Sequence, residues 1–158
     1  MRSLRIAFLL FVCIFSSIRL SAKDEPPIYY VESAGIGAQG TYLLKVTVIT
    51  KKASVKDDEL CKAAVHAVLF RGFQDGSMGS QKPLAGDETV EENHKDFFSK
   101  FYDNATYRNY VTMITGTRSI VKTADKRIRT TANVTVMKDR LRKYLEQQGV
   151  VKALGGGF

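Results

Sequence analysis

The chain has 158 residues, of which 44% are hydrophobic and 25% are charged, a balance typical of a soluble globular protein. It carries 24 basic and 16 acidic residues, a formal net charge of +8. After the first 22 residues, the sequence contains no apolar stretch long enough to span a membrane and only one cysteine, Cys61. These features exclude an internal disulfide beyond that point and predict an inert thiol buried among apolar neighbours.

Residues 1–22 are typical of a secretory signal peptide that is cleaved near Ala22. Arg2 and Arg5 precede the apolar stretch 6–15, and small residues follow it. Cleavage removes three arginines and lowers the excess of basic residues from eight to five. We therefore expect export to the periplasm or outer envelope and no transmembrane segment in the mature protein.

The remaining chain is long enough for a single domain. We expect a polar leader at 23–27, one α+β domain at 28–154 and a flexible, glycine-rich tail at 155–158. In the domain, β-rich residues at Ile28–Glu32 predict a first strand. Strictly alternating apolar residues at Thr41–Lys51 predict a second strand.

Helical spacing of apolar residues, many of them alanine, predicts a helix at Lys56–Arg71. Residues 72–86 contain four glycines and a proline and are expected to form a loop. A second helix is predicted at Thr89–Tyr102, where three phenylalanines share one face. Both helices are expected to pack on the sheet.

Alternation predicts two further strands, Thr112–Thr123 and Lys126–Val136, joined by a turn, and then a helix at Lys138–Gln148. The resulting order is ββααββα. It predicts a two-layer α+β sandwich, in which a four-stranded antiparallel sheet has its helices on one face. The other face is expected to be polar and positive, and its residues would be Lys45, Thr47, Arg127, Arg129 and Thr131.

The glycines of residues 35–40 match the dinucleotide-binding pattern GxGxxG. That pattern requires a helix directly after the glycines, whereas here an alternating strand follows. We therefore interpret these glycines as a hairpin turn or bulge, and no cofactor is predicted.

The long loop at 72–86 is the preferred candidate binding site, because loops of this length inside compact domains are often functional. The binding residues are expected in and beside it: Arg71, Phe73, Gln81, Lys82 and His66.

Charge is distributed unevenly along the chain. Residues 23–105 hold 10 basic and 13 acidic residues, whereas residues 106–158 hold 11 basic and 3 acidic residues. One interpretation is that the two halves balance each other on a solvated surface. The alternative is binding of anionic envelope components, such as lipid heads or acidic glycan, through Arg127, Arg129 and Lys143. Export argues against nucleic acid as the partner.

Catalytic and metal-binding patterns are not recognisable. The two histidines, His66 and His94, lack further ligands at metal-site spacing, and no serine or cysteine lies in a nucleophile motif. No catalytic residue and no metal site is therefore predicted. A small hydrolase assembled from dispersed residues remains a second alternative.

Three segments, 37–46, 64–73 and Gln81–Pro83, resemble a group of small exported proteins of Gram-negative bacteria to which no catalytic role is assigned. The resemblance implies a periplasmic or outer-envelope protein. Together with the residues above, it favours a non-catalytic interaction or envelope-associated module whose partner and oligomeric state are unknown.

Overall fold

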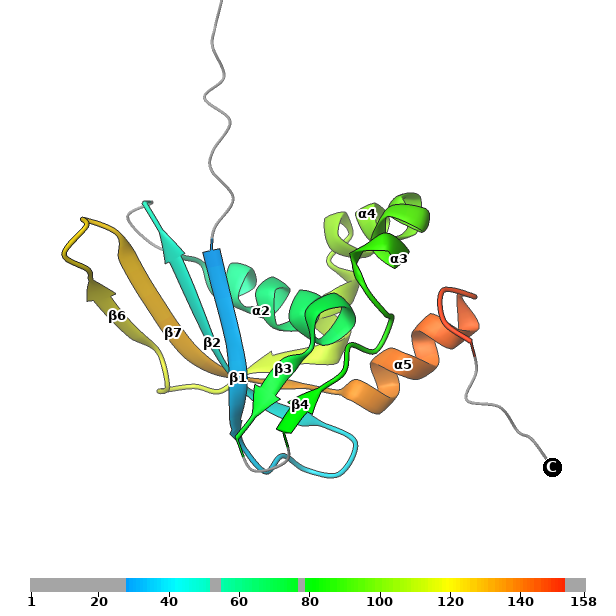
Figure 1. The fold of residues 1–158 in the computed structure, drawn as a ribbon, viewed down its shortest axis with the longest axis horizontal. Coiled ribbons are helices and arrows are strands. Elements are labelled where there is room, and N and C mark those ends of the chain that lie inside the picture. The colour runs from blue at the N-terminus through cyan, green and yellow to red at the C-terminus, as the bar shows by residue number, and fades with distance from the viewer. Residues whose placement is uncertain (1–27, 52–54, 77–78, 153–158) are drawn as a thin grey trace, which may run out of the picture.

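The structure is a computed structural model that describes residues 28–51, 55–76 and 79–152 (Figure 1). The predicted signal peptide, polar leader and tail lie outside these residues. Among the described residues, no helix has the length and apolarity that crossing a membrane requires.

The centre of the fold is an antiparallel sheet of three strands, each of which was predicted from the sequence. β1 (Ile28–Gly35) pairs with β2 (Tyr42–Thr50), which pairs in turn with β7 (Ile128–Val136) over nine residue pairs. Every second residue of β2 and β7 points into the core and is fully or almost fully buried: Leu44, Val46, Val48, Thr130, Ala132, Val134 and Val136. The predictions for these strands are confirmed.

The strand predicted at Thr112–Thr123 is two short strands, β5 (Val111–Met113) and β6 (Ser119–Lys122), which both pair with β7. The intervening residues bulge out of the sheet. The hydroxyl of Thr117 takes a place in the interrupted ladder, because it accepts a hydrogen bond from the amide of Asn133 (2.9 Å) and donates one to the carbonyl of Ile114 (2.7 Å). A side chain that replaces a backbone hydrogen-bonding partner in this way does not alter the alternation of apolar residues. The interruption of the strand therefore could not be predicted from the sequence.

The prediction of a four-stranded antiparallel sheet is wrong. The sheet has seven strands in the order β4-β3-β1-β2-β7-β5, with β6 also on β7, and β3 runs parallel to β1. The segment predicted as a loop contains β3 (Phe73–Asp75) and β4 (Gly79–Gln81). These strands of three residues are too short to show a period of two, and the burial of Phe73 holds them against the body of the protein. The α+β class itself is confirmed.

The first predicted helix consists of α2 (Asp57–His66) and a π-helical turn, η2 (Ala67–Arg71), and it ends at Gly72 as expected. The second is broken at His94, whose backbone (φ −115°, ψ 30°) separates α3 (Glu88–Asn93) from α4 (Lys95–Asp103). A 3₁₀ turn, η3 (Thr106–Tyr110), precedes β5, and α5 (Lys138–Gln147) follows β7.

The core lies between the sheet and the helices. Figure 1 shows α2 lying along one face of the sheet, with α3, α4 and α5 beyond it. Ala63 and Ala64 of α2 are buried, which allows the close approach to the sheet that the alanines predicted. Phe98, Phe101 and Tyr107 fill the space between α4, η3 and the sheet. On the other sheet face, Thr47 and Thr131 lie 3.1 Å apart through their hydroxyls.

Candidate functional site

A cavity of about 450 Å³ lies where the β1–β2 connection, β3, β4 and the start of α5 meet. We call it the hairpin pocket. Its lining consists of residues 35–43 together with Ser33, Phe73, Asp75, Gln81 and Lys138. Ligand sites in proteins are concave, mostly apolar and furnished with a few polar groups, and this cavity has that composition.

Two aromatic rings form the apolar part of the hairpin pocket. The rings of Tyr42 and Phe73 meet edge to face, with centroids 4.9 Å apart and planes at 78°. The ammonium of Lys138 lies 4.9 Å from the centroid of the Tyr42 ring, within the range of a cation–π contact. Phe73 is buried, with 6% of its surface exposed, so its contact with the Tyr42 ring holds that ring in position against the core.

The glycine-rich wall of the hairpin pocket is held against α5. Gly40 has φ +74°, and a Cβ atom there would lie 2.6 Å from the Asp139 carboxylate. The amide of Asp139 also donates a hydrogen bond to the Gly40 carbonyl (3.2 Å). Only glycine combines this backbone conformation with this close approach. Because the glycines connect two antiparallel strands and no helix follows them, the hairpin-turn interpretation of the GxGxxG pattern is confirmed.

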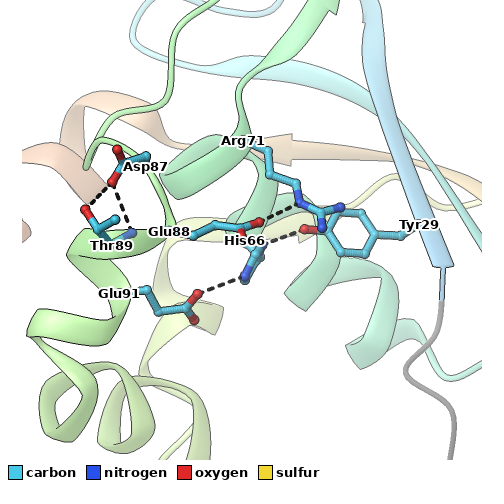
Figure 2. A network of polar contacts seen from close by, with 7 residues as sticks. All are labelled: Tyr29, His66, Arg71, Asp87, Glu88, Thr89 and Glu91. Carbon is cyan, nitrogen blue, oxygen red and sulfur yellow. Dashed lines mark hydrogen bonds and ion pairs between the residues drawn. The ribbon is translucent and has the colours of Figure 1, made fainter.

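A second polar cluster surrounds His66 at the end of α2 (Figure 2). The Tyr29 hydroxyl lies 2.5 Å from His66 Nδ1, and Oε2 of Glu91 lies 3.2 Å from His66 Nε2. With the ring hydrogen on Nε2, Tyr29 donates to Nδ1 and His66 donates to Glu91. The imidazole is therefore fully hydrogen-bonded between β1 and α3.

Arg71 extends this cluster. Its guanidinium lies 4.8 Å from the centroid of the Tyr29 ring, and its Nε atom lies 3.4 Å from Oε1 of Glu88. Asp87 caps α3 by accepting a hydrogen bond from the amide of Thr89 (3.0 Å), as Figure 2 also shows. The cluster thus fastens α3 to α2 and β1.

The chemistry of the His66 cluster does not provide an activated nucleophile. Burial raises the pKa of Tyr29, and the charge of Arg71 offsets this only in part. Burial also raises the pKa of Cys61, and the carboxylates of Asp58 and Asp57 raise it further. Both groups stay protonated at neutral pH, so neither the phenol nor the thiol is poised for attack.

Next to Glu91, a depression of about 570 Å³ runs along α3 and α4 and is lined by Glu91, Glu92, Lys95, Phe98, Ser99 and Tyr102. The Tyr102 hydroxyl itself is buried and has no hydrogen-bond partner in the part of the chain that the structure describes. Burial and the nearby charge of Glu91 raise its pKa. Because this hydroxyl is shielded from solvent, it does not offer a polar contact in the depression.

The structure divides four of the five predicted binding residues between two places and leaves Lys82 outside both. Phe73 and Gln81 line the hairpin pocket, whereas His66 and Arg71 belong to the His66 cluster. Lys82 follows β4 and is exposed. Tyr42, Asp75 and Lys138 also line the hairpin pocket, but they were not predicted from the sequence as binding residues. Of these, only Tyr42 carried a usable pattern, as an aromatic residue on the inward face of an alternating strand.

The three basic residues of the anion-binding alternative are not on one element. Arg129 is exposed on β7, and Arg127, directly before this strand, forms an ion pair with Asp125 (3.1 Å). Lys143 lies on α5, which Figure 1 places at the other end of the sheet from β6. Arg127 and Arg129 therefore lie close together, but Lys143 is separate from them.

Within residues 28–51, 55–76 and 79–152, no group of three or more His, Cys, Asp or Glu side chains is placed to hold a metal ion. The fold and the pocket define the class of an α+β protein with a mixed sheet and a preformed surface cavity at one end. No model of a protein family, no curated protein and no solved structure matches the chain.

Proposed function

We propose that the protein is exported and acts as a non-catalytic binding module whose ligand occupies the hairpin pocket. The observation that carries this proposal is the convergence of an aromatic pair, two charged side chains and two amide side chains around a cavity of about 450 Å³. Its walls come from distant parts of the chain and are joined by defined contacts. Such a preformed cavity binds a ligand without first ordering its own residues.

The proposed location outside the cytoplasm rests on the predicted signal peptide. N-terminal sequencing of the protein recovered from cell envelope fractions should give a chain that begins near Lys23. A protein that still begins at Met1 inside the cell would contradict export.

Binding is tested by recording the amide NMR spectrum of the purified protein during titration with a library of small polar and aromatic compounds. The proposal expects shifts confined to residues 35–43, 73–75 and 79–81. If no compound shifts these amides, the hairpin pocket is not a binding site. Shifts confined to α3 and α4 would instead identify the depression beside Glu91 as the site.

The variant used with this titration must leave the fold intact. Phe73→Ala is unsuitable because Phe73 is buried, and truncation of a buried phenylalanine costs about 3–5 kcal/mol. Lys138→Gln removes the pocket cation and keeps most of the aliphatic stem. Lys143→Gln, five residues further along the same helix and exposed, removes an equal charge away from the pocket and is the matched control.

A further inference from the structure

The polar side chains of the hairpin pocket are not engaged with the rest of the protein. Asp75, Gln81 and Lys138 make no ion pair and no side-chain hydrogen bond with any described residue; the one contact of Lys138 is with the face of the Tyr42 ring. Several charged residues elsewhere on the described surface are paired, as Lys45 is with Glu32 (2.8 Å) and Arg71 is with Glu88 (3.4 Å). The hairpin pocket therefore presents one free carboxylate and one free ammonium.

The position of Lys138 is unfavourable for the helix that carries it. Lys138 is the first residue of α5, where a positive charge faces the positive end of the helix dipole. The charge of Lys138 therefore does not stabilise α5. An anionic group placed beside Lys138 would relieve this unfavourable charge and form a hydrogen bond with the ammonium.

Asp75 and Lys138 line the same cavity but form no ion pair with each other among the described residues. A ligand that satisfies both must carry a cation for Asp75 and an anion for Lys138. It must also offer apolar surface to Tyr42 and a hydrogen-bonding group to Gln81, which line the same cavity. An ammonium and a carboxylate on one small, partly apolar molecule meet these requirements.

We infer that the hairpin pocket binds a zwitterion with an ammonium and a carboxylate, which is the chemistry of a free amino acid or a short peptide. This inference rests on the proposed function and specifies its ligand. The ammonium of the ligand lies at Asp75, its carboxylate lies at Lys138, and an apolar side chain packs on Tyr42.

The test measures dissociation constants by calorimetry for phenylalanine and for alanyl-phenylalanine, each in its free form, with its amine acetylated and with its carboxylate amidated. For the wild-type protein, acetylation and amidation should each weaken binding about tenfold or more, because each removes one charge-assisted hydrogen bond. Tighter binding of the dipeptide identifies peptides as the source of the zwitterion, and tighter binding of phenylalanine identifies free amino acids.

Two variants test which residue of the pocket binds each charged end of the ligand. In Asp75→Asn, acetylation should no longer weaken binding while amidation still does; in Lys138→Gln, the reverse should hold. Lys143→Gln should behave as the wild type. Amide shifts at residues 35–43 must accompany the binding in each case.

Failure of the inference is distinguishable from failure of the proposed function. If neutral aromatic compounds shift the pocket amides and bind as well as the zwitterions do, the pocket is a site but the zwitterion inference is wrong. If acetylation weakens binding equally in the wild type and in Asp75→Asn, the assignment of the carboxylate is wrong. If neither neutral nor charged compounds shift these amides, both proposals fail.

Discussion

The hydroxyl of Tyr29 lies 2.5 Å from Nδ1 of His66, which joins the second residue of β1 to the last residue of α2. The opposite ring nitrogen of His66 contacts Glu91 of α3. One imidazole therefore connects the sheet, α2 and α3. His66 is a quarter exposed, so its hydrogen bonds are only partly replaceable by water.

His66→Phe should lower the free energy of unfolding by about 1–3 kcal/mol, because the phenyl ring keeps the edge contact with Phe70 while two half-buried polar groups lose their partner. Urea unfolding followed by circular dichroism measures this loss. Glu92→Gln, at the exposed position beside Glu91, is the control and should change stability by less than about 0.5 kcal/mol. Equal stability of the two variants would show that the His66 cluster does not fasten α3.

A different carboxylate should govern the response to acid. Burial by itself raises the pKa of Asp58, but hydrogen bonds from Tyr107 and Arg108 and the charge of Lys62 lower it below its ordinary value of 3.8 in the folded protein. Because the folded protein binds this proton less readily than the unfolded chain does, Asp58 stabilises the fold above pH 3.8. This stabilisation is lost as the pH falls through the still lower pKa of the folded state.

Asp58→Asn should therefore cost about 1–3 kcal/mol at neutral pH, where it removes a charged hydrogen-bond acceptor. The difference from the wild type should shrink in acid, below pH 3.8. Denaturant unfolding at a series of pH values measures this. Asp57→Asn, at the exposed neighbouring position paired with Arg118, should cost less than about 1 kcal/mol at neutral pH. A pH-independent deficit in Asp58→Asn would contradict the prediction.

Sequence patterns predicted the strands and helices that are long enough for their buried face to produce a regular spacing of apolar residues. The alternation of β2 and β7 was visible because each strand buries one face over nine residues. The pairing of β3 with β1 could not be predicted, because it joins Glu32 to Gln74 in a parallel register that no local pattern encodes. The interruption at His94 was missed because Val90 before the helix junction and the phenylalanines after it keep helical spacing.

The candidate site was predicted only in part, for a similar reason. The glycines around Phe73 drew attention to the correct segment, but the segment is a pair of edge strands rather than a loop. Asp75 and Lys138 are distant in sequence, and each is unremarkable among many charged residues. Only the path of β7 into α5 brings Lys138 to the cavity that Phe73 and Gln81 line.

The turn from η2 into β3 should tolerate no side chain. Gly72 has φ +70°, and a Cβ atom there would collide with the carbonyl oxygen of Gln81 on β4. Gly72→Ala should lower the free energy of unfolding by about 2 kcal/mol or more, because a backbone with φ +70° and ψ −172° alone costs a residue other than glycine roughly 1–3 kcal/mol. Amide NMR shifts at Phe73 and Gln81 should accompany the loss.

Gly76→Ala is the matched control for Gly72→Ala. A Cβ atom at Gly76 meets no atom of the described residues within 4 Å, and its backbone is not left-handed. Its stability should equal that of the wild type or exceed it by a few tenths of a kcal/mol, because alanine restricts the unfolded chain. Comparable losses in the two variants would show that the collision with Gln81 is not the cause.

Removal of a polar group should stabilise the sheet at one position. Thr130 of β7 is 0% exposed, and its hydroxyl has no hydrogen-bond partner among the described residues. Valine has the same branched shape without the buried hydroxyl, so Thr130→Val should raise the free energy of unfolding by about 1 kcal/mol. Thr131→Val, one residue further on the open face, removes the hydrogen bond with Thr47 and should instead lower it by about 0.5–1 kcal/mol. Urea unfolding of both variants measures the contrast, and a loss of stability in Thr130→Val would mean that this hydroxyl has a partner in solution.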